Sequence, residues 1–159
     1  MKIVIVSDTH GSRKNIENVC ECNPDVDMLI HLGDVEDDED YIEAIFGCPT
    51  HIVGGNNDFF SRLPREEEFE LEGHHIFITH GHAYYVSMGE AHLQEEARRR
   101  GADIVMYGHT HVPALTIDAD LVTLNPGSLT YPRQQGRQAT YMVMKLEKGK
   151  QPEVELKTV

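Results

Sequence analysis

The sequence is poor in three features that would assign it to a specialised class of protein: cysteines, long apolar runs and basic residues. Three cysteines in 159 residues are too few, and odd in number, for the disulfide framework of a small secreted protein. The apolar run Ile3–Val6 is shorter than the core of a signal peptide, and no run approaches the roughly 20 residues that span a bilayer. We therefore expect a cytoplasmic protein with no membrane partner.

Basic residues are outnumbered by acidic ones. There are 14 Lys and Arg against 27 Asp and Glu, which gives a formal net charge of −13. Because proteins bind nucleic-acid phosphates with clusters of Lys and Arg, we expect no nucleic-acid partner. The length and the 40% hydrophobic content favour one globular domain over residues 1–159. Histidine, by contrast, is abundant: ten residues, several of them beside glycine, indicate a metal site.

Short apolar runs alternate with glycine-punctuated polar turns along the chain. We expect strands at residues 3–6, 28–32, 50–53, 68–72, 75–79, 103–107, 115–117, 121–124, 140–146 and 154–156. We expect one helix at residues 13–21 and a second that starts in the acidic run 36–40 and ends before Gly47. A third is expected at residues 87–100, with a capping box formed by Ser87 and Glu90. Strand–helix alternation followed by a β-rich end predicts an α/β sandwich of two packed sheets with helices outside.

Five polar clusters with glycine each follow an expected strand. They are Ser7–Gly11, Gly33–Asp34, Gly54–Asp58, Thr79–His82 and Gly108–His111. Ligands of open α/β sheets bind at the carboxyl ends of the strands, and glycine lets the backbone turn sharply there. The clusters supply carboxylate, amide and imidazole donors but no thiolate, so they are candidates for a shared metal site.

In order and content these clusters resemble the motifs of the calcineurin-like metallophosphoesterase superfamily, and specifically its small bacterial and archaeal phosphodiesterase branch. The matching motifs are Asp8-x-His10, Gly33-Asp34, Gly55-Asn56-x-Asp58, His80-Gly81-His82 and Gly108-His109-x-His111, followed by Asn125–Ser128 and Pro132-Arg133. One such motif occurs often by chance, but five in the required order are specific. The resemblance implies a four-layer αββα sandwich, in which two packed mixed sheets are flanked by helices.

The resemblance also implies a site for two divalent metal ions. The first ion would be bound by Asp8, His10, Asp34 and His111, and the second by Asp34, Asn56, His80 and His109. Asp34 would bridge the ions, and a hydroxide between them would attack a phosphodiester. Imidazole ligands favour Mn, and also suit Ni, Fe, Co or Zn, whereas Mg prefers oxygen ligands. Asp34, Asn56 and His82 are the expected catalytic residues.

One position departs from the pattern of many superfamily members. Asn57 stands where they carry a histidine that protonates the leaving group, and an amide cannot act as an acid. His82 is the nearest alternative acid along the sequence. The competing interpretation, which we weight equally, is that His82 orients a metal ligand. Asp58 is expected to orient its neighbours and not to react.

Other residues receive plainer interpretations. His31 is expected to be a hydrogen-bonded core histidine, and the acidic run 36–40 a solvated helix start. Asn125–Ser128 is expected to be a rigid turn that braces the site. Four basic residues follow the motifs closely enough to contact phosphate, although Lys and Arg are usually solvated surface charges. They are Arg13, Lys14, Arg62 and Arg133.

Alternative functions remain open for the same fold. A phosphomonoesterase or protein phosphatase would act on a phosphate with one more negative charge. The net charge of −13 disfavours a DNA nuclease. A non-catalytic scaffold like that of the retromer coat has partly lost its metal ligands, whereas every ligand position is filled here.

The charge of the expected site favours a diester substrate. Two divalent ions, two carboxylates and a hydroxide leave about one positive charge, which matches the single negative charge of a phosphodiester. We expect a small phosphoester substrate, and the sequence leaves a homo-oligomer open.

Overall fold

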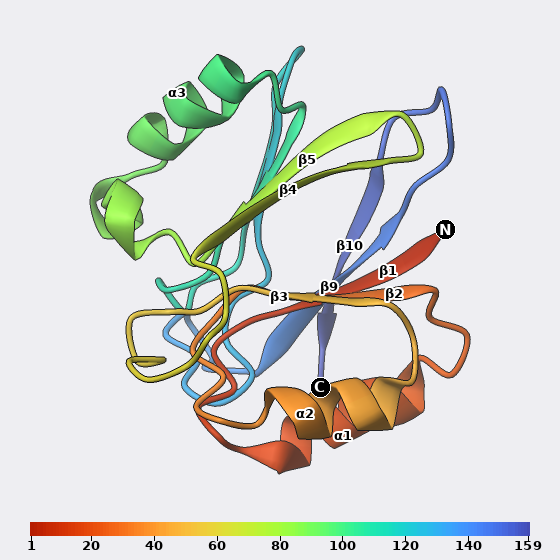
Figure 1. Cartoon of the computed structure of the whole chain (residues 1–159), viewed down its shortest axis with the longest axis vertical. Helices are drawn as coiled ribbons and strands as arrows, with labels where there is room; N and C mark the ends of the chain where they lie inside the picture. The colour runs from red at the N-terminus through yellow and green to blue at the C-terminus, as the bar shows by residue number, and fades with distance from the viewer.

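Two five-stranded β-sheets pack face to face in the computed structural model, which describes residues 1–159 (Figure 1). The strand order is β10-β9-β1-β2-β3 in the first sheet and β4-β5-β6-β8-β7 in the second. The strands are β1 (Lys2–Val6), β2 (Met28–His31), β3 (Thr50–Ile52), β4 (Glu66–Leu71), β5 (His74–Thr79), β6 (Ile104–Met106), β7 (Ala114–Ile117), β8 (Val122–Asn125), β9 (Thr140–Lys145) and β10 (Glu153–Thr158). The α-helices are α1 (Arg13–Cys22), α2 (Glu39–Phe46) and α3 (Ala91–Arg100).

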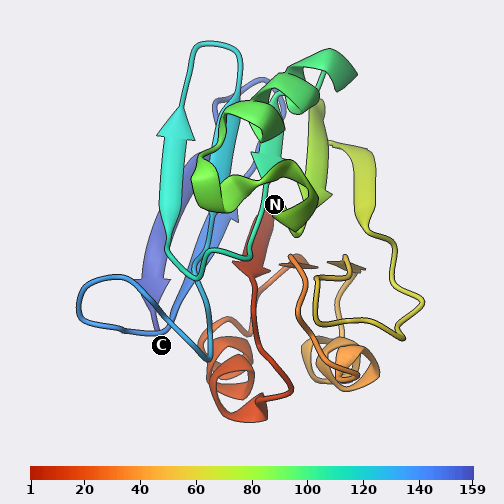
Figure 2. The same cartoon turned by 90° about the vertical axis from the view of Figure 1, so that its left-hand side faces the viewer.

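Both sheets are mixed and both are covered by helices. The parallel pairs are β1 with β2, β2 with β3, β5 with β6 and β6 with β8. The strands β4, β7, β9 and β10 pair antiparallel with their neighbours. Figure 2 shows α1 and α2 on the outer side of the first sheet and α3 on the outer side of the second. The predicted four-layer sandwich is therefore confirmed. None of the helices is both long enough and apolar enough to cross a membrane.

Side-chain alternation along the strands explains the layers. Ile3 and Ile5 of β1 belong to the apolar cluster between the two sheets, whereas Val4 and Val6 belong to the cluster under α1 and α2. A third cluster, which includes Phe77 and Leu93, lies between the second sheet and α3. The short continuous apolar runs predict strands that are buried on both faces, and β1 is buried by the second sheet on one face and by α1 and α2 on the other.

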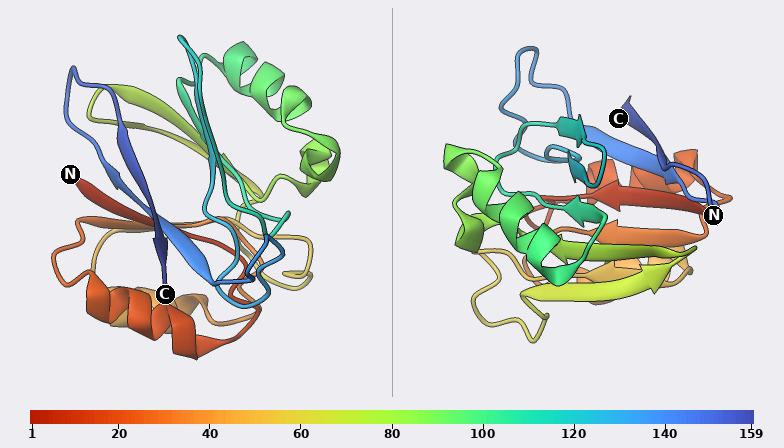
Figure 3. Two further views of the ribbon diagram at one scale, coloured as in Figure 1. Left: turned by 180° about the vertical axis from the view of Figure 1, so that it is seen from behind. Right: turned by 90° about the horizontal axis from the view of Figure 1, so that it is seen from above.

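The parallel strands of both sheets end at the same end of the sandwich. The loops that follow β1, β2 and β3 of one sheet and β5, β6 and β8 of the other gather there (Figure 3). The five polar clusters of the sequence lie in these loops. The fold thus brings donors that are far apart in the chain to one edge of each sheet.

The third helix is shorter than expected, and its capping-box prediction is wrong. The helix begins at Ala91, and Ser87 lies in a short 3₁₀ helix, Val86–Met88. Gly89, with φ 134° and ψ 165°, separates the two helices. The carboxylate of Glu90 instead accepts a hydrogen bond of 2.6 Å from the hydroxyl of Tyr107. A tertiary contact has replaced the local cap.

Candidate metal centre

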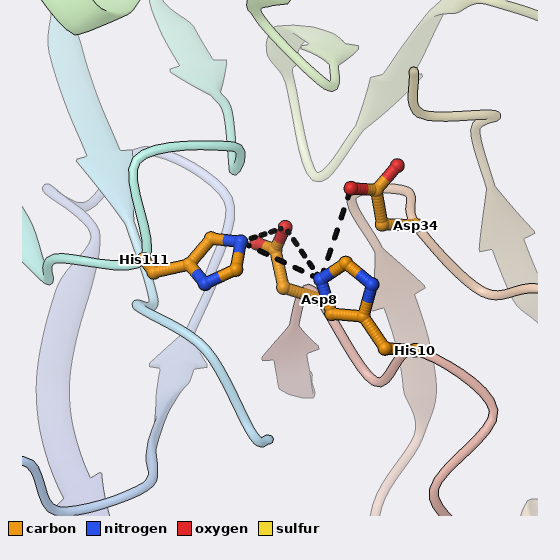
Figure 4. Close-up of side chains that lie close together, drawn as sticks. All are labelled: Asp8, His10, Asp34 and His111. Atoms are coloured by element: carbon orange, nitrogen blue, oxygen red, sulfur yellow. Dashed lines mark hydrogen bonds and ion pairs between the residues drawn. The ribbon is translucent and has the colours of Figure 1, made fainter. Parts of the chain in front are cut away.

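Four side chains from three of these loops come together at the end of the sandwich (Figure 4). Asp8 and His10 follow β1, Asp34 follows β2 and His111 follows β6, so both sheets contribute. One donor atom from each side chain lies within 4.8 Å of the others. These are the four residues predicted for the first metal, and we refer to them as the first group.

Hydrogen bonds from Nδ1 orient two of the histidine rings. Nδ1 of His111 donates to the main-chain oxygen of Tyr131 at 2.8 Å, and Nδ1 of His80 donates to that of Leu32 at 2.6 Å. A carbonyl oxygen can only accept, so Nδ1 carries the proton in both rings. In the neutral ring Nε2 then presents a lone pair, which is the form of histidine that binds metals.

Both Nε2 atoms face buried carboxylates. Nε2 of His111 lies 3.1 Å from Oδ1 of Asp8, and Nε2 of His80 lies 3.5 Å from Oδ2 of Asp34. Oδ1 of Asp8 is buried, and no group donates a hydrogen bond to it. A nitrogen lone pair facing a carboxylate oxygen is unfavourable unless a cation or a proton lies between them. The residues present therefore fit a divalent metal ion.

A second group of donors adjoins the first through Asp34. Asn56 follows β3, His80 follows β5 and His109 follows β6. Nε2 of His80 lies 3.1 Å from Oδ1 of Asn56, and the ring centroids of His80 and His109 are 5.2 Å apart. Oδ2 of Asp34 is 3.8 Å from Nε2 of His10 and 3.5 Å from Nε2 of His80. The structure thus brings together every residue predicted for the second metal, with Asp34 between the two groups.

The charges at the centre keep both carboxylates ionised. Burial raises the pKa of Asp8, but the adjacent imidazoles of His111 and His80 outweigh burial and lower it. Burial also opposes ionisation of Asp34, yet His80 and the amide groups of Asn57 bring its pKa well below the usual range. Two buried and ionised carboxylates create a strong local attraction for a cation.

Five residues of the two groups have a left-handed backbone. The φ angles are 56° at Asp8, 48° at His10, 56° at Asp34, 68° at His109 and 59° at His111. Such angles cost a non-glycine residue about 1–3 kcal/mol and persist only where the surrounding structure imposes them. Here hydrogen bonds between loops do so, since the amide of His10 donates to the carbonyl of Asp34 at 2.9 Å. Strain of this kind concentrates at functional sites.

Asn57 and Asp58 hold the loop that follows β3. The main-chain nitrogen of Asn57 donates to Oδ1 of Asp34 at 2.9 Å, and its Nδ2 donates to Oδ2 at 2.7 Å. The carboxylate of Asp58 accepts hydrogen bonds from the main-chain nitrogens of Val35, Glu36 and Gly55. Asp58 therefore fixes two loops against each other, as predicted for a residue that orients its neighbours.

His82 lies beside the second group without being bonded to it. Its ring centroid is 5.5 Å from that of His80 and 6.0 Å from that of His109. Nδ1 of His82 is buried and has no hydrogen-bond partner. Burial, followed by the proximity of His80 and Arg65, lowers the pKa of His82. Because no hydrogen bond joins its ring to a predicted ligand, the geometry argues against a ligand-orienting role.

Glu36 is a site residue that the sequence pattern does not reveal. The acidic run was expected to be a solvated helix start, but α2 begins at Glu39, and Oε1 of Glu36 lies 2.7 Å from Nδ1 of His10. The main-chain nitrogen of Glu36 donates to Asp58 at 2.7 Å. The prediction of a helix start is therefore wrong at this residue, although the Glu36 side chain is exposed to solvent as expected. A separation of 26 positions from His10 leaves no local signal for the contact.

Two supporting features are as predicted. His31 is fully buried, and its Nε2 lies 3.0 Å from the hydroxyl of Thr9. Nδ2 of Asn125 donates to the carbonyl of Gly108 at 2.9 Å, and the hydroxyl of Ser128 donates to the carbonyl of Asp8 at 3.0 Å. The turn after β8 thus braces the loops that carry the first group.

Proteins with similar sequences include metallophosphoesterases, a class of enzyme that binds metal ions. A probable metallophosphoesterase of Methanocaldococcus jannaschii is 35% identical over 136 residues, which cover 84% of this chain and 70% of that protein. The phosphodiesterase YfcE of Escherichia coli K12 is 28% identical over an alignment of 165 positions, which covers 89% of this chain and 85% of YfcE.

Solved structures share the fold, and a family model matches the sequence. A predicted phosphoesterase from Streptococcus pneumoniae has a TM-score of 0.85 at 30% identity, covering 99% of this chain and 88% of that one. A Vps29 variant from Entamoeba histolytica shares the fold with a TM-score of 0.80 at 18% identity, covering 100% and 99% of the two chains. The model of the calcineurin-like phosphoesterase superfamily domain matches residues 1–149. The chain therefore belongs to the calcineurin-like phosphoesterase superfamily.

Proposed function

We propose that the protein is a phosphodiesterase that works with two divalent metal ions, of which Mn²⁺ is favoured. The observation that carries the proposal is the orientation of His80 and His111, whose Nε2 lone pairs face the buried carboxylates of Asp34 and Asp8. The phosphodiesterase YfcE, at 28% identity, supports the ester class. The mixture of imidazole and carboxylate donors suits Mn, Fe, Co, Ni or Zn better than Mg.

The bound ions would polarise phosphate oxygens and lower the pKa of a water molecule between them. The first group, Asp8, His10, Asp34 and His111, would hold one ion, and Asp34, Asn56, His80 and His109 would hold the other. Asp34 sets the relative position of the two groups, since its carboxylate faces histidines of both. Asn56 supplies a neutral oxygen, so the second group keeps more of the charge of its ion for binding phosphate.

We assign protonation of the leaving group to His82. Its ring stands next to the second group, and Nδ1 has no partner within the protein. Asn57 cannot take this role, because it is an amide and its N–H groups are used by Asp34. The negative charge of a bound phosphate would favour protonation of His82.

The scaffold and nuclease alternatives are weaker for this chain. All seven predicted donors lie in or beside the loops at one end of the sandwich, and a scaffold has no need of a buried carboxylate oxygen without a hydrogen-bond partner, such as Oδ1 of Asp8. A net charge of −13 repels a long nucleic acid. A small diester with one negative charge suits the charge balance of two divalent ions, two carboxylates and a hydroxide.

The experiment is a metal add-back assay on two model esters. The protein is stripped with a chelator, and Mn²⁺, Ni²⁺, Zn²⁺ or Mg²⁺ is returned with bis(4-nitrophenyl) phosphate or 4-nitrophenyl phosphate as substrate. We expect metal-dependent turnover with kcat/KM at least about tenfold higher for the diester, a difference of about 1.4 kcal/mol. The Asp34→Asn variant should lose activity by orders of magnitude while its circular dichroism is unchanged. A tenfold preference for the monoester, or activity that survives both the chelator and Asp34→Asn, contradicts the proposal.

A separate assay tests the role of His82. The His82→Ala variant should lose more activity on a diester with an alkoxide leaving group than on one with nitrophenolate, because nitrophenolate leaves without a proton. The difference is expected to be about 10²-fold, which is typical for loss of a general acid. Equal losses on both substrates would assign His82 to positioning and not to proton transfer.

A further inference from the structure

Half of the eight arginines of this acidic protein have no carboxylate partner. Four of its arginines pair with Asp or Glu: Arg13, Arg98, Arg99 and Arg100. Arg65 donates to the main-chain carbonyls of Gly55 and Asp58, and Arg62 has no ion pair. Arg133 and Arg137 also form no ion pair, although the chain has 27 acidic residues. Both are exposed and lie in the loop between β8 and β9. A cation without a partner in such surroundings is free to bind an external anion.

The two arginines line one hollow beside the first group of donors. The hollow has a volume of about 560 Å³, and Thr130, Tyr131, Pro132, Arg133 and Arg137 form its walls. The ring of Tyr131 has its centroid 5.0 Å from that of His10 and 6.5 Å from that of His111. A ligand in the hollow would therefore border the metal centre without replacing its donors.

Backbone hydrogen bonds hold this loop in place. The amide of Arg133 donates to the carbonyl of His111 at 3.0 Å, and the amide of Tyr131 donates to the hydroxyl of Ser128 at 2.9 Å. The amide of Arg137 donates to the carbonyl of Gln134 at 3.0 Å, in a turn where Arg137 has a φ of 46°. A tight turn thus places the second arginine on the same hollow as the first.

We propose that this hollow is a subsite for a second oxyanion of the substrate, one ester unit away from the scissile phosphate. The proposal deepens the proposed phosphodiesterase function and rests on it for the position of the scissile group. Guanidinium groups present planar forks of donors that match phosphate and carboxylate oxygens. The exposed face of Tyr131 offers a flat apolar surface for the organic part between the two anions. The preferred substrate would then be a diester that carries an additional phosphate or carboxylate.

The arginines have an alternative use, which is to hold the extra oxygen of a monoester at the metal centre. The two uses differ in what an arginine substitution does to a substrate without the second anion. If the arginines contact the scissile phosphate, the substitutions lower kcat/KM for every substrate. If they contact a second oxyanion, the substitutions lower kcat/KM only for substrates that carry this oxyanion.

The test compares two substrates that differ only in this group. They are thymidine 5′-(4-nitrophenyl phosphate) and its 3′-phosphorylated form, which share the scissile diester and the leaving group. The double variant Arg133→Gln/Arg137→Gln should lower kcat/KM for the 3′-phosphorylated substrate at least about tenfold, mainly through KM, and change the other less than about twofold. Lys148→Gln, which removes an unpaired cation in the turn between β9 and β10, is the matched control and should alter neither.

Each other outcome has a definite meaning. Equal losses on both substrates, or no loss on either, overturn the subsite. If the wild-type protein hydrolyses neither substrate with any metal, the proposed function fails, and a binding measurement decides the subsite. Thymidine 3′,5′-bisphosphate is titrated into the metal-free protein, and the Nε–H resonances of Arg133 and Arg137 are followed by NMR. Shifts at both arginines support the subsite, and unchanged resonances overturn it.

Discussion

Glu36 gives His10 a hydrogen-bond environment different from that of His80 and His111. His80 and His111 donate their Nδ1 protons to main-chain carbonyls, whereas His10 faces the carboxylate of Glu36 at 2.7 Å. A carboxylate partner makes an imidazole more basic than a carbonyl does and strengthens its bond to a metal. The first group therefore depends on a charged residue that lies outside the ligand set.

We predict that Glu36→Gln weakens metal binding at the first group. The amide can still accept the hydrogen bond from His10 but lacks the charge, so the affinity for Mn²⁺ should fall about 10–100-fold. The value of kcat at saturating Mn²⁺ should change little. Competition against a fluorescent chelator measures the affinity. Asp37→Asn is the control, because Asp37 is the next residue, is exposed and also has a positive φ of 64°. Equal affinities for the two variants would contradict the role of Glu36.

At the scale of the elements, the loops after the strands approach one another so closely that glycine is required. A Cβ atom on Gly55 would overlap Oδ1 of Asp34 and lie 2.8 Å from its Cγ. Gly55 follows β3 and Asp34 follows β2, so the contact joins two loops of the same sheet. The position of the carboxylate shared by the two groups thus depends on a residue with no side chain.

We predict that Gly55→Ala displaces Asp34 and abolishes Mn²⁺ binding. Overpacking of this kind should also lower the free energy of unfolding by roughly 1–3 kcal/mol. Gly54→Ala is the matched control: its nearest neighbour would be Nη1 of Arg65 at 3.2 Å, a contact that a shift of a few tenths of an ångström relieves. Isothermal titration with Mn²⁺ and urea unfolding of the metal-free variants measure both effects. Full Mn²⁺ binding by Gly55→Ala would contradict this account of the loop.

At the scale of the whole molecule, the two sheets are joined at the end where the acidic centre lies. The first group takes Asp8, His10 and Asp34 from loops of the first sheet and His111 from the second. A metal ion bound by these residues would link the sheets, and it would bind the folded state alone, because the unfolded chain does not bring the donors together. Metal binding should therefore stabilise the entire fold.

We predict that Mn²⁺ raises Tm. At a free concentration of about 100 times Kd, the stabilisation is about 2.7 kcal/mol, which corresponds to roughly 5–10 °C for a chain of this length. Calorimetry with and without chelator measures the shift. Asp34→Asn should abolish most of it, whereas Glu70→Gln, which removes an exposed carboxylate on β4, should leave it intact. A shift that persists in Asp34→Asn would place the stabilising ion elsewhere.

The sequence alone predicted the layers of the fold and the polar clusters of the candidate site, and the family resemblance supplied the expected ligand set. Apolar strands such as Ile3–Val6 are local patterns, and the polar clusters follow such strands directly, so the rule that ligands bind at strand ends predicted that the clusters meet. The tertiary structure alone decided the start of α3, the contact of Glu36 with His10 and the placement of Arg133 and Arg137 on one hollow beside the first group. These depend on contacts between loops far apart in the chain: Tyr107 takes the carboxylate that would cap the helix, and 26 residues separate Glu36 from His10. Local propensity carries no information about such contacts, because their energy comes from neighbours that only the folded chain supplies.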